Sequence, residues 1–169
     1  GPNAASLQND TVRLKWTALT GIIEYDYQLD TVYFWKSMAS GVTSTLFGTS
    51  VVDENHAWIA GAGGLVLFND GTSWTEQEST LSTDLYNVKF LDASNGWAVG
   101  KGGKIVYFNG NVWAEQPSGT TNDLLSVHML DANNGWAVGK SGTVLYFNGS
   151  AWSSQYTATR DLNTVFALD

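Results

Sequence analysis

The chain has 169 residues, of which 43% are hydrophobic and 13% aromatic, and its 16 Asp and Glu against 8 Lys and Arg give a net charge of −8. This composition predicts a globular protein, and the acidic balance argues against a nucleic-acid partner. No cysteine is present, which excludes disulfides and thiolate metal sites, and no apolar run approaches 18 residues, so we expect no membrane insertion.

The first predicted elements are two strands near the N-terminus. Residues 1–11 open with Gly-Pro, which is typical of a cleaved affinity tag, and we interpret them as a tag scar and a tail. Apolar and polar residues then alternate over 12–18 and over 23–29, the period of a strand with two different faces. A turn between these runs places Lys15 opposite Asp26, a favourable cross-strand pair.

The middle and end of the chain consist of repeats. The hexapeptide NGWAVG occurs at 95–100 and again at 134–139, and the stretches 85–113 and 124–152 that contain it are identical at 18 of 29 positions. A weaker copy covers 46–74, so the offset is 39 residues each time. A period near 40 without a helical pattern indicates a solenoid or four-stranded propeller blades.

Each repeat contains four short strand patterns. In the second copy, YNVKFLD ends in turn residues, and WAVG is followed by a glycine-rich turn. The run KIVYF is apolar on successive residues, which is typical of a strand buried on both faces. Asn109 and Gly110 then predict a hairpin into a fourth strand around Trp113. Four such strands in about 40 residues are typical of a propeller blade.

The tryptophans support this division. Each repeat has one in its second strand and one in its fourth, and we expect all of them to pack as structural core: Trp58 and Trp74, Trp97 and Trp113, Trp136 and Trp152. The remaining two, Trp16 and Trp35, predict a blade over 12–37 that lacks its first strand. The run LNTVFAL at 162–168 matches the first strand of the other repeats and would complete that blade.

The sequence therefore predicts an all-β fold, a β-propeller of about 40-residue four-stranded blades, in one domain over 12–169. The blades are placed at 46–78, 85–117 and 124–156, with a further blade of 12–37 completed by 162–168, and the simplest result is a closed ring of four. The alternating charges over 12–29 do not suit a sheet covered on both sides. The alternative is an open half-propeller that completes its ring as a homodimer.

The run GWAVGKSGTVLYFNGSAW resembles the WAVG-type repeats of exported bacterial β-propellers, which are similar to bacterial neuraminidase repeats and to photosystem II assembly-factor propellers. The resemblance covers about 46–169 and implies an extracellular, periplasmic or cell-surface location. Sialidases bind a carboxylate with three arginines, but this chain has only Arg13 and Arg160, so sialidase activity is not expected. Residues 12–31 also faintly resemble two strands of fibronectin type III domains, over about 20 residues.

Candidate binding residues lie on turns and links. Three lysines fall on the glycine-rich turns of the repeats, and the last link carries a tyrosine and an arginine: Lys101, Lys104, Lys140, Tyr156 and Arg160. We expect the lysine turns to form the less acidic end of the molecule. The recurring aspartates at the opposite strand ends are interpreted as turn formers and not as metal ligands: Asp53, Asp92, Asp131 and Asp169.

Neither histidine supports a catalytic or metal site, because His56 and His128 occupy unrelated positions of the repeat and no known catalytic motif accompanies them. We therefore predict a protein that is not an enzyme and needs no cofactor. The preferred function is a binding scaffold of an exported bacterial protein, which contacts a protein partner through the polar links between blades. The alternatives are a lectin-like propeller that binds a glycan, and a partial propeller that associates with itself.

Overall fold

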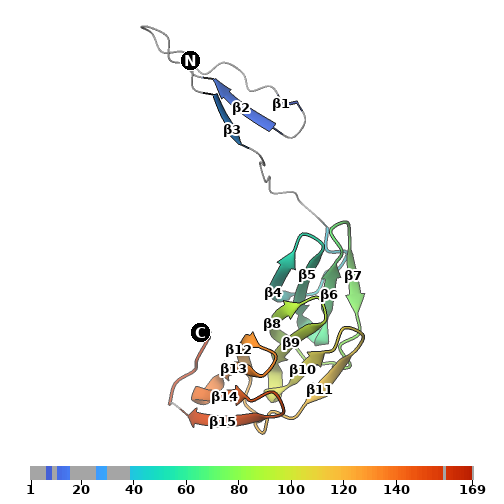
Figure 1. The fold of residues 1–169 in the computed structure, drawn as a ribbon. Coiled ribbons are helices and arrows are strands. Elements are labelled where there is room, and N and C mark those ends of the chain that lie inside the picture. Colours follow the sequence, from blue (N-terminus) through green and yellow to red (C-terminus); the bar gives the residue numbers. More distant parts are fainter. Residues whose placement is uncertain (1–6, 9–10, 16–25, 30–38, 158, 169) are drawn as a thin grey trace. The chain divides into compact units, whose positions relative to one another are not determined.

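The computed structural model describes residues 7–8, 11–15, 26–29, 39–157 and 159–168 (Figure 1). The chain divides into two compact units, Gly1–Met38 and Ala39–Asp169. Each unit is described by itself.

The N-terminal unit contains a small antiparallel sheet in the order β1-β2-β3, with β1 at Leu7–Gln8, β2 at Thr11–Lys15 and β3 at Asp26–Leu29. Lys15 is the register partner of Asp26, so the predicted pairing of these strands is confirmed. The tryptophans predicted for this segment, Trp16 and Trp35, lie outside the described residues.

The second unit consists of three four-stranded antiparallel sheets that follow one another along the chain (Figure 1). Blade 1 comprises β4 Leu46–Asp53, β5 His56–Gly61, β6 Val66–Asn69 and β7 Trp74–Gln77. Blade 2 comprises β8 Leu85–Asp92, β9 Asn95–Gly100, β10 Ile105–Phe108 and β11 Trp113–Gln116. Blade 3 comprises β12 Leu124–Asp131, β13 Asn134–Gly139, β14 Thr143–Phe147 and β15 Trp152–Thr157.

Propeller-like blades are thus confirmed, but the predicted closed ring of four is not what the described residues form. They contain three complete blades. A fourth blade requires a sheet that joins 162–168 to the N-terminal strands, whereas β1, β2 and β3 form a sheet of their own. Residues 162–168 have no strand partner within the described part of the chain, for which reason they are not assigned to a sheet.

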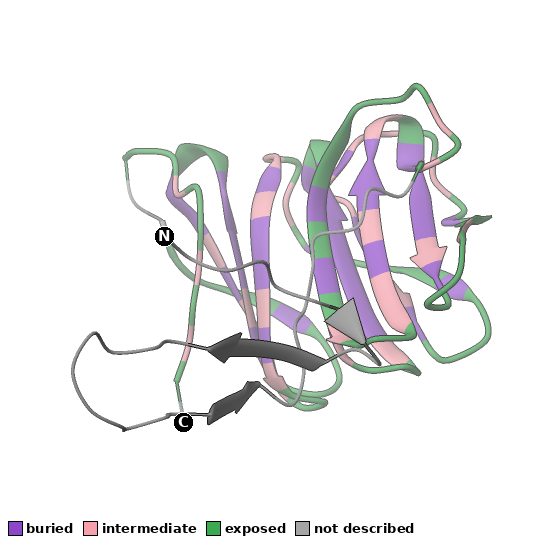
Figure 2. Ribbon diagram, turned by 90° about the horizontal axis from the view of Figure 1, so that it is seen from above, coloured by how far each residue is buried: buried purple, intermediate pink, exposed green. Residues whose placement is uncertain are grey.

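The core of this unit lies between the blades, where the faces of adjacent sheets meet, and buried positions recur along the strands of all three (Figure 2). Between blades 1 and 2, the ring of Trp58 stacks on Phe90 with 3.6 Å between centroids. Between blades 2 and 3, Trp97 packs among Leu124, Met129 and Phe147. Burial on both faces of the sheet also explains why successive residues of β10 are apolar, since Ile105 and Val106 are both fully buried.

The second tryptophan of a blade links it to the blade before. The indole Nε1–H of Trp113 donates to Gln77 Oε1 at 3.2 Å, and that of Trp152 donates to Gln116 Oε1 at 2.9 Å. Both tryptophans are buried, at 3% and 7% exposure, whereas Trp74, their equivalent in blade 1, is partly exposed.

Residues of the repeated hexapeptide have structural roles in the turn, in the core and in the packing of the backbone. Asn95 donates its side-chain amide to Asp92 and accepts a bond from the Tyr107 hydroxyl at 2.7 Å. Trp97 fills the core toward the next blade. The backbone of Gly100 is extended, but a Cβ there would lie 2.0 Å from the carbonyl oxygen of Asp84. Glycine is required here because two backbones approach closely.

Candidate interaction surfaces

The glycine-rich turns and the links between blades meet at one end of the strands, where the carboxylate of each link caps the turn of the preceding blade. The side chain of Asp84 accepts the Gly63 N–H at 2.9 Å, Asp123 accepts that of Gly102 at 2.8 Å, and Asp161 accepts that of Ser141 at 2.9 Å. We call this the link end. The bonds fix the links against the blades, so the loops there have a defined shape.

Two of the three predicted lysines are neutralised at the link end. Lys104 Nζ lies 2.6 Å from Glu115 Oε1, and Lys140 Nζ lies 2.7 Å from Asp161 Oδ2. The bond to Asp161 raises the pKa of Lys140, and the same bond lowers the pKa of Asp161. Lys101 is exposed. Carboxylates therefore accompany two of the three lysines at this end of the molecule.

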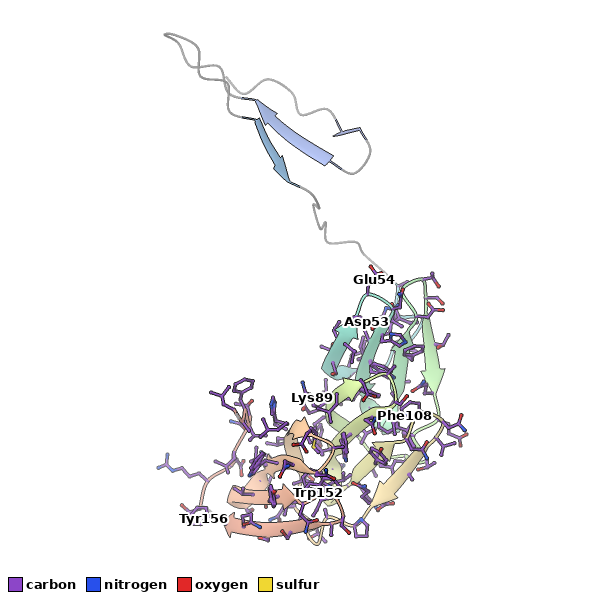
Figure 3. All side chains as sticks on the ribbon, viewed as in Figure 1. Asp53, Glu54, Lys89, Phe108, Trp152 and Tyr156 are labelled. Carbon is purple, nitrogen blue, oxygen red and sulfur yellow. The ribbon has the colours of Figure 1, made fainter. Side chains whose placement is uncertain are left out.

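An open depression of about 570 Å³ lies at the link end of blade 2. Its lining comes from the glycine turn after β9, from β11 and from the link that follows: Gly102, Gly103, Lys104, Glu115, Gln116 and residues 118–122. Of the predicted binding residues, the depression contains Lys104. Tyr156 lies elsewhere, on β15 (Figure 3), and is exposed. Arg160 lies on the last link and is also exposed.

The opposite end carries the aspartate turns, which we call the turn end. Asp53, Asp92 and Asp131 each accept the backbone N–H of the residue two positions further on. These bonds lower the pKa of the Asp53 and Asp92 carboxyl groups because they stabilise the charged form. The pKa of Asp131 is lowered mainly by the side-chain amide of Asn134 and then by its backbone bond. The turn-forming role is confirmed for these three, and Asp169 lies outside the described residues.

Asp70 has the largest such shift at the turn end. Its Oδ1 accepts bonds from the Thr72 hydroxyl, the Thr72 N–H and the Ser73 N–H. With the hydroxyl bond contributing most, these bonds lower the pKa of Asp70 to about 2. This is a satisfied turn and not a free acid.

The two histidines lie apart in the repeat, as predicted, and have local partners. His56 Nδ1 is 2.8 Å from Asp53 Oδ1 in the first turn of blade 1. The ring of His128 lies against that of Phe166, with 4.7 Å between centroids, and burial together with nearby Lys89 lowers the pKa of His128. Neither pair includes a nucleophile positioned for attack.

Blade 3 has one face that no further blade covers within the described chain. Trp136 is partly exposed, whereas its repeat equivalents Trp58 and Trp97 are only 1% and 2% exposed. Phe166 and Leu168, at 74% and 80% exposure, are large apolar side chains on the segment that follows this blade. The sequence pattern could not identify this surface, because the hexapeptides of blades 2 and 3 are identical.

The segment Asp161–Leu168 occupies the place of a first strand beyond blade 3. The Leu162 N–H donates to Gly139 O at 3.0 Å, and the Val165 N–H donates to Ser126 Oγ at 3.2 Å. The second bond repeats the one between Val127 N–H and Asn87 Oδ1 that joins the first strands of blades 2 and 3. The sequence match of 162–168 to a first strand thus predicted its place, but not the missing partner strand.

None of the helices in the described part of the chain is long and apolar enough to cross a bilayer. No family model matches the sequence, and no curated protein matches it. Among solved structures, the chain is similar to a YCF48 bound to D1 peptide, with a TM-score of 0.59 and 20% identity over 68% of this chain and 42% of that one. It is also similar to YCF48 from Cyanidioschyzon merolae, with a TM-score of 0.62 and 25% identity over 74% and 44%.

These likenesses support the propeller fold. The chain spans less than half the length of either YCF48 structure, since the matched regions cover 42% and 44% of them.

Proposed function

We propose that this chain is a non-enzymatic scaffold that binds a protein partner in extended conformation at the link end. The observation that carries the proposal is the depression beside blade 2. It is lined by glycine backbone, by hydroxyl groups and by one paired lysine, Lys104. Such a lining offers donors and acceptors for a peptide backbone, and the links that form it are held by the carboxylate caps described above.

The likeness to a YCF48 that is bound to D1 peptide supports a polypeptide partner. Charge also bears on the choice, because Lys104 and Lys140 are paired with carboxylates, which weakens the case for a nucleic acid or a phosphorylated ligand at this end. Export from a bacterial cell belongs to the same proposal and rests on the resemblance of the repeats. A lectin function has less support, since four of the six tryptophans among the described residues are buried: Trp58, Trp97, Trp113 and Trp152.

The proposal is tested with a phage-displayed library of random 12-residue peptides, panned against the immobilised chain. We expect enriched peptides that lose binding to Thr121→Trp, because Thr121 lines the depression and is exposed, so that a large ring there fills the depression without disturbing a core. The matched control is Ser150→Trp, which adds the same ring to an exposed site at the turn end. An absence of enriched peptides, or equal loss with both variants, would refute a site at the link end.

A further inference from the structure

On the uncovered side of blade 3, the residues are apolar like their equivalents in blades 1 and 2, which are buried. Val144 in β14 corresponds to Val66 and Ile105, which are both fully buried under the next blade, yet Val144 is partly exposed. Trp136 shows the same difference from its two equivalents. We call Trp136, Val144, Gln155 and the segment Asp161–Leu168 the open face. Its apolar residues are equivalent to those of blades 1 and 2 that the following blade covers.

The segment Asp161–Leu168 also presents an unused strand edge. It is held on blade 3 by the bonds of Leu162 and Val165 and by the contacts of Asp161 with Lys140 and Ser141. Its residue Phe166 corresponds to Lys89 and His128. Each of those lies opposite the tryptophan of the second strand in its β-ladder, so the backbone of Phe166 stands where a second strand would pair.

Gln155 supplies a third matching feature. Its equivalents Gln77 and Gln116 each accept an indole N–H from the fourth strand of the following blade. Gln155 donates its amide to Ser153 Oγ, and its Oε1 accepts no bond from any residue that the structure describes. In the β-ladders Gln77 lies opposite Val66 and Gln116 opposite Ile105, whereas β15 has an extra residue here, so that Tyr156 lies opposite Val144 and Gln155 comes next to it. The open face therefore has an acceptor beside the position where the two complete interfaces bind a tryptophan.

We propose that the open face binds a three-stranded antiparallel β-segment of a polypeptide partner with the sequence pattern of the second to fourth strands of this repeat. The first strand of the new blade is already present as Asp161–Leu168. The partner adds the second strand to its edge, covers Trp136 and Val144 with apolar side chains, and donates a tryptophan N–H to Gln155. Strand addition of this kind combines main-chain hydrogen bonds with side-chain pockets.

The expected side chains of the partner follow from the two complete interfaces, in which the next blade covers the surface that is open on blade 3. In blade 2 the second to fourth strands carry Ala98, Val106 and Phe108 toward blade 1, all buried. Trp113 completes the set and forms the bond to Gln77. A partner with small and apolar residues at these positions reproduces an interface that the chain already forms. This surface is separate from the depression at the link end and does not depend on the function proposed above.

The test uses a fluorescein-labelled peptide with the sequence of residues 95–116, titrated into the full chain and followed by fluorescence anisotropy. We expect saturable one-to-one binding. Phe166→Pro removes the N–H at the edge and should weaken binding at least about tenfold, while the preceding residue keeps its preference for extended backbone. Phe166→Ala keeps the N–H and should stay within about threefold of the unchanged chain. Circular dichroism confirms that both variants are folded.

A double-mutant cycle tests the bond to Gln155. Gln155→Ala in the chain and Trp113→Phe in the peptide should each weaken binding about three- to tenfold, the effect of one neutral hydrogen bond. The two changes together should weaken it no more than either alone, because both remove the same bond. Additive losses would overturn this pairing.

Two other results overturn the proposal as a whole. One is the absence of saturable peptide binding, and the other is binding that Phe166→Pro leaves unchanged. Light scattering of the full chain shows whether a second copy of this chain binds the open face. If the chain self-associates and the peptide reverses that association, the proposal is supported, because the second copy and the peptide then compete for the same site. Thr121→Trp should leave peptide binding unchanged, which separates this test from that of the link end.

Discussion

The first and last faces of the three-blade unit differ, although both lack a neighbour among the described residues. On blade 1, the exposed Thr49 replaces the buried Val88 of blade 2, Asn69 replaces Phe108 although both are 6% exposed, and Val51 is 69% exposed. On blade 3, Trp136 is the same residue as the buried Trp97. A terminal repeat of an array needs a polar outer face to remain soluble. The first face has polar residues at two positions that are apolar in a covered interface, and the last one has kept the apolar composition.

The largest expected effect compares the same residue at a covered and an open position. Trp97→Ala should lower the free energy of unfolding by about 3–5 kcal/mol, because it leaves a cavity in the core between blades 2 and 3. Trp136→Ala should lower it by less than about 2 kcal/mol, since that ring already contacts solvent. Urea denaturation measures both. Equal losses would mean that a partner or another part of the chain covers Trp136 in solution.

The second prediction moves the residue of the first face into a covered interface. Phe108→Asn should destabilise the protein by about 2–4 kcal/mol, because Phe108 is 6% exposed between blades and an amide there loses apolar contacts and has no bonding partner supplied. The control is Val112→Asn, at an exposed position close by in the same hairpin. A small effect of Phe108→Asn, similar to the control, would show that the polar residues on blade 1 do not distinguish an outer face.

The third prediction concerns a turn in which blade 3 departs from the other two. Ser141 has φ +53°, while its equivalents Gly63 and Gly102 have φ +70° and +69°. Ser141→Gly should raise the free energy of unfolding by up to about 1 kcal/mol, since glycine adopts the left-handed region without steric strain. Gly102→Ser should have the opposite sign and a similar size, because no atom lies within 4 Å of a Cβ there. Thermal unfolding of the two variants checks the signs.

The smallest effect is the pH dependence that Asp70 adds in blade 1. Asp70 corresponds to Asn109 and Asn148 in the other blades, and its pKa is about 2 in the folded chain against an ordinary 3.8. The folded state thus holds the charged form, so its contribution is fully present above pH 4 and is lost as the pH falls toward 2. Asp70→Asn should flatten this part of the stability curve, measured by urea midpoints from pH 5 to 2. Asn148→Asp should steepen it, and a flat response to both would contradict the assigned hydrogen bonds.

Much of the fold could be predicted from local pattern. The alternation around Lys15 and Asp26 indicated the correct strand register, and the turn residues around Asn109 indicated the hairpin between β10 and β11. Both signals act over a few residues, through side-chain alternation and turn chemistry. The predicted fourth blade depended instead on a contact between the two ends of the chain. Matching strand patterns show that two segments are compatible, but they do not show that the segments pair.

The candidate surfaces depended more on tertiary structure. The sequence by itself determined that this chain has repeated four-stranded blades, because the 39-residue period carries its own strands, turns and core tryptophans. It could not show that Lys104 and Lys140 meet carboxylates 11 and 21 residues further on. Nor could it distinguish Trp97 from Trp136 within identical hexapeptides. Burial and pairing depend on which blade lies next to a residue, and only the packing of the blades decides that.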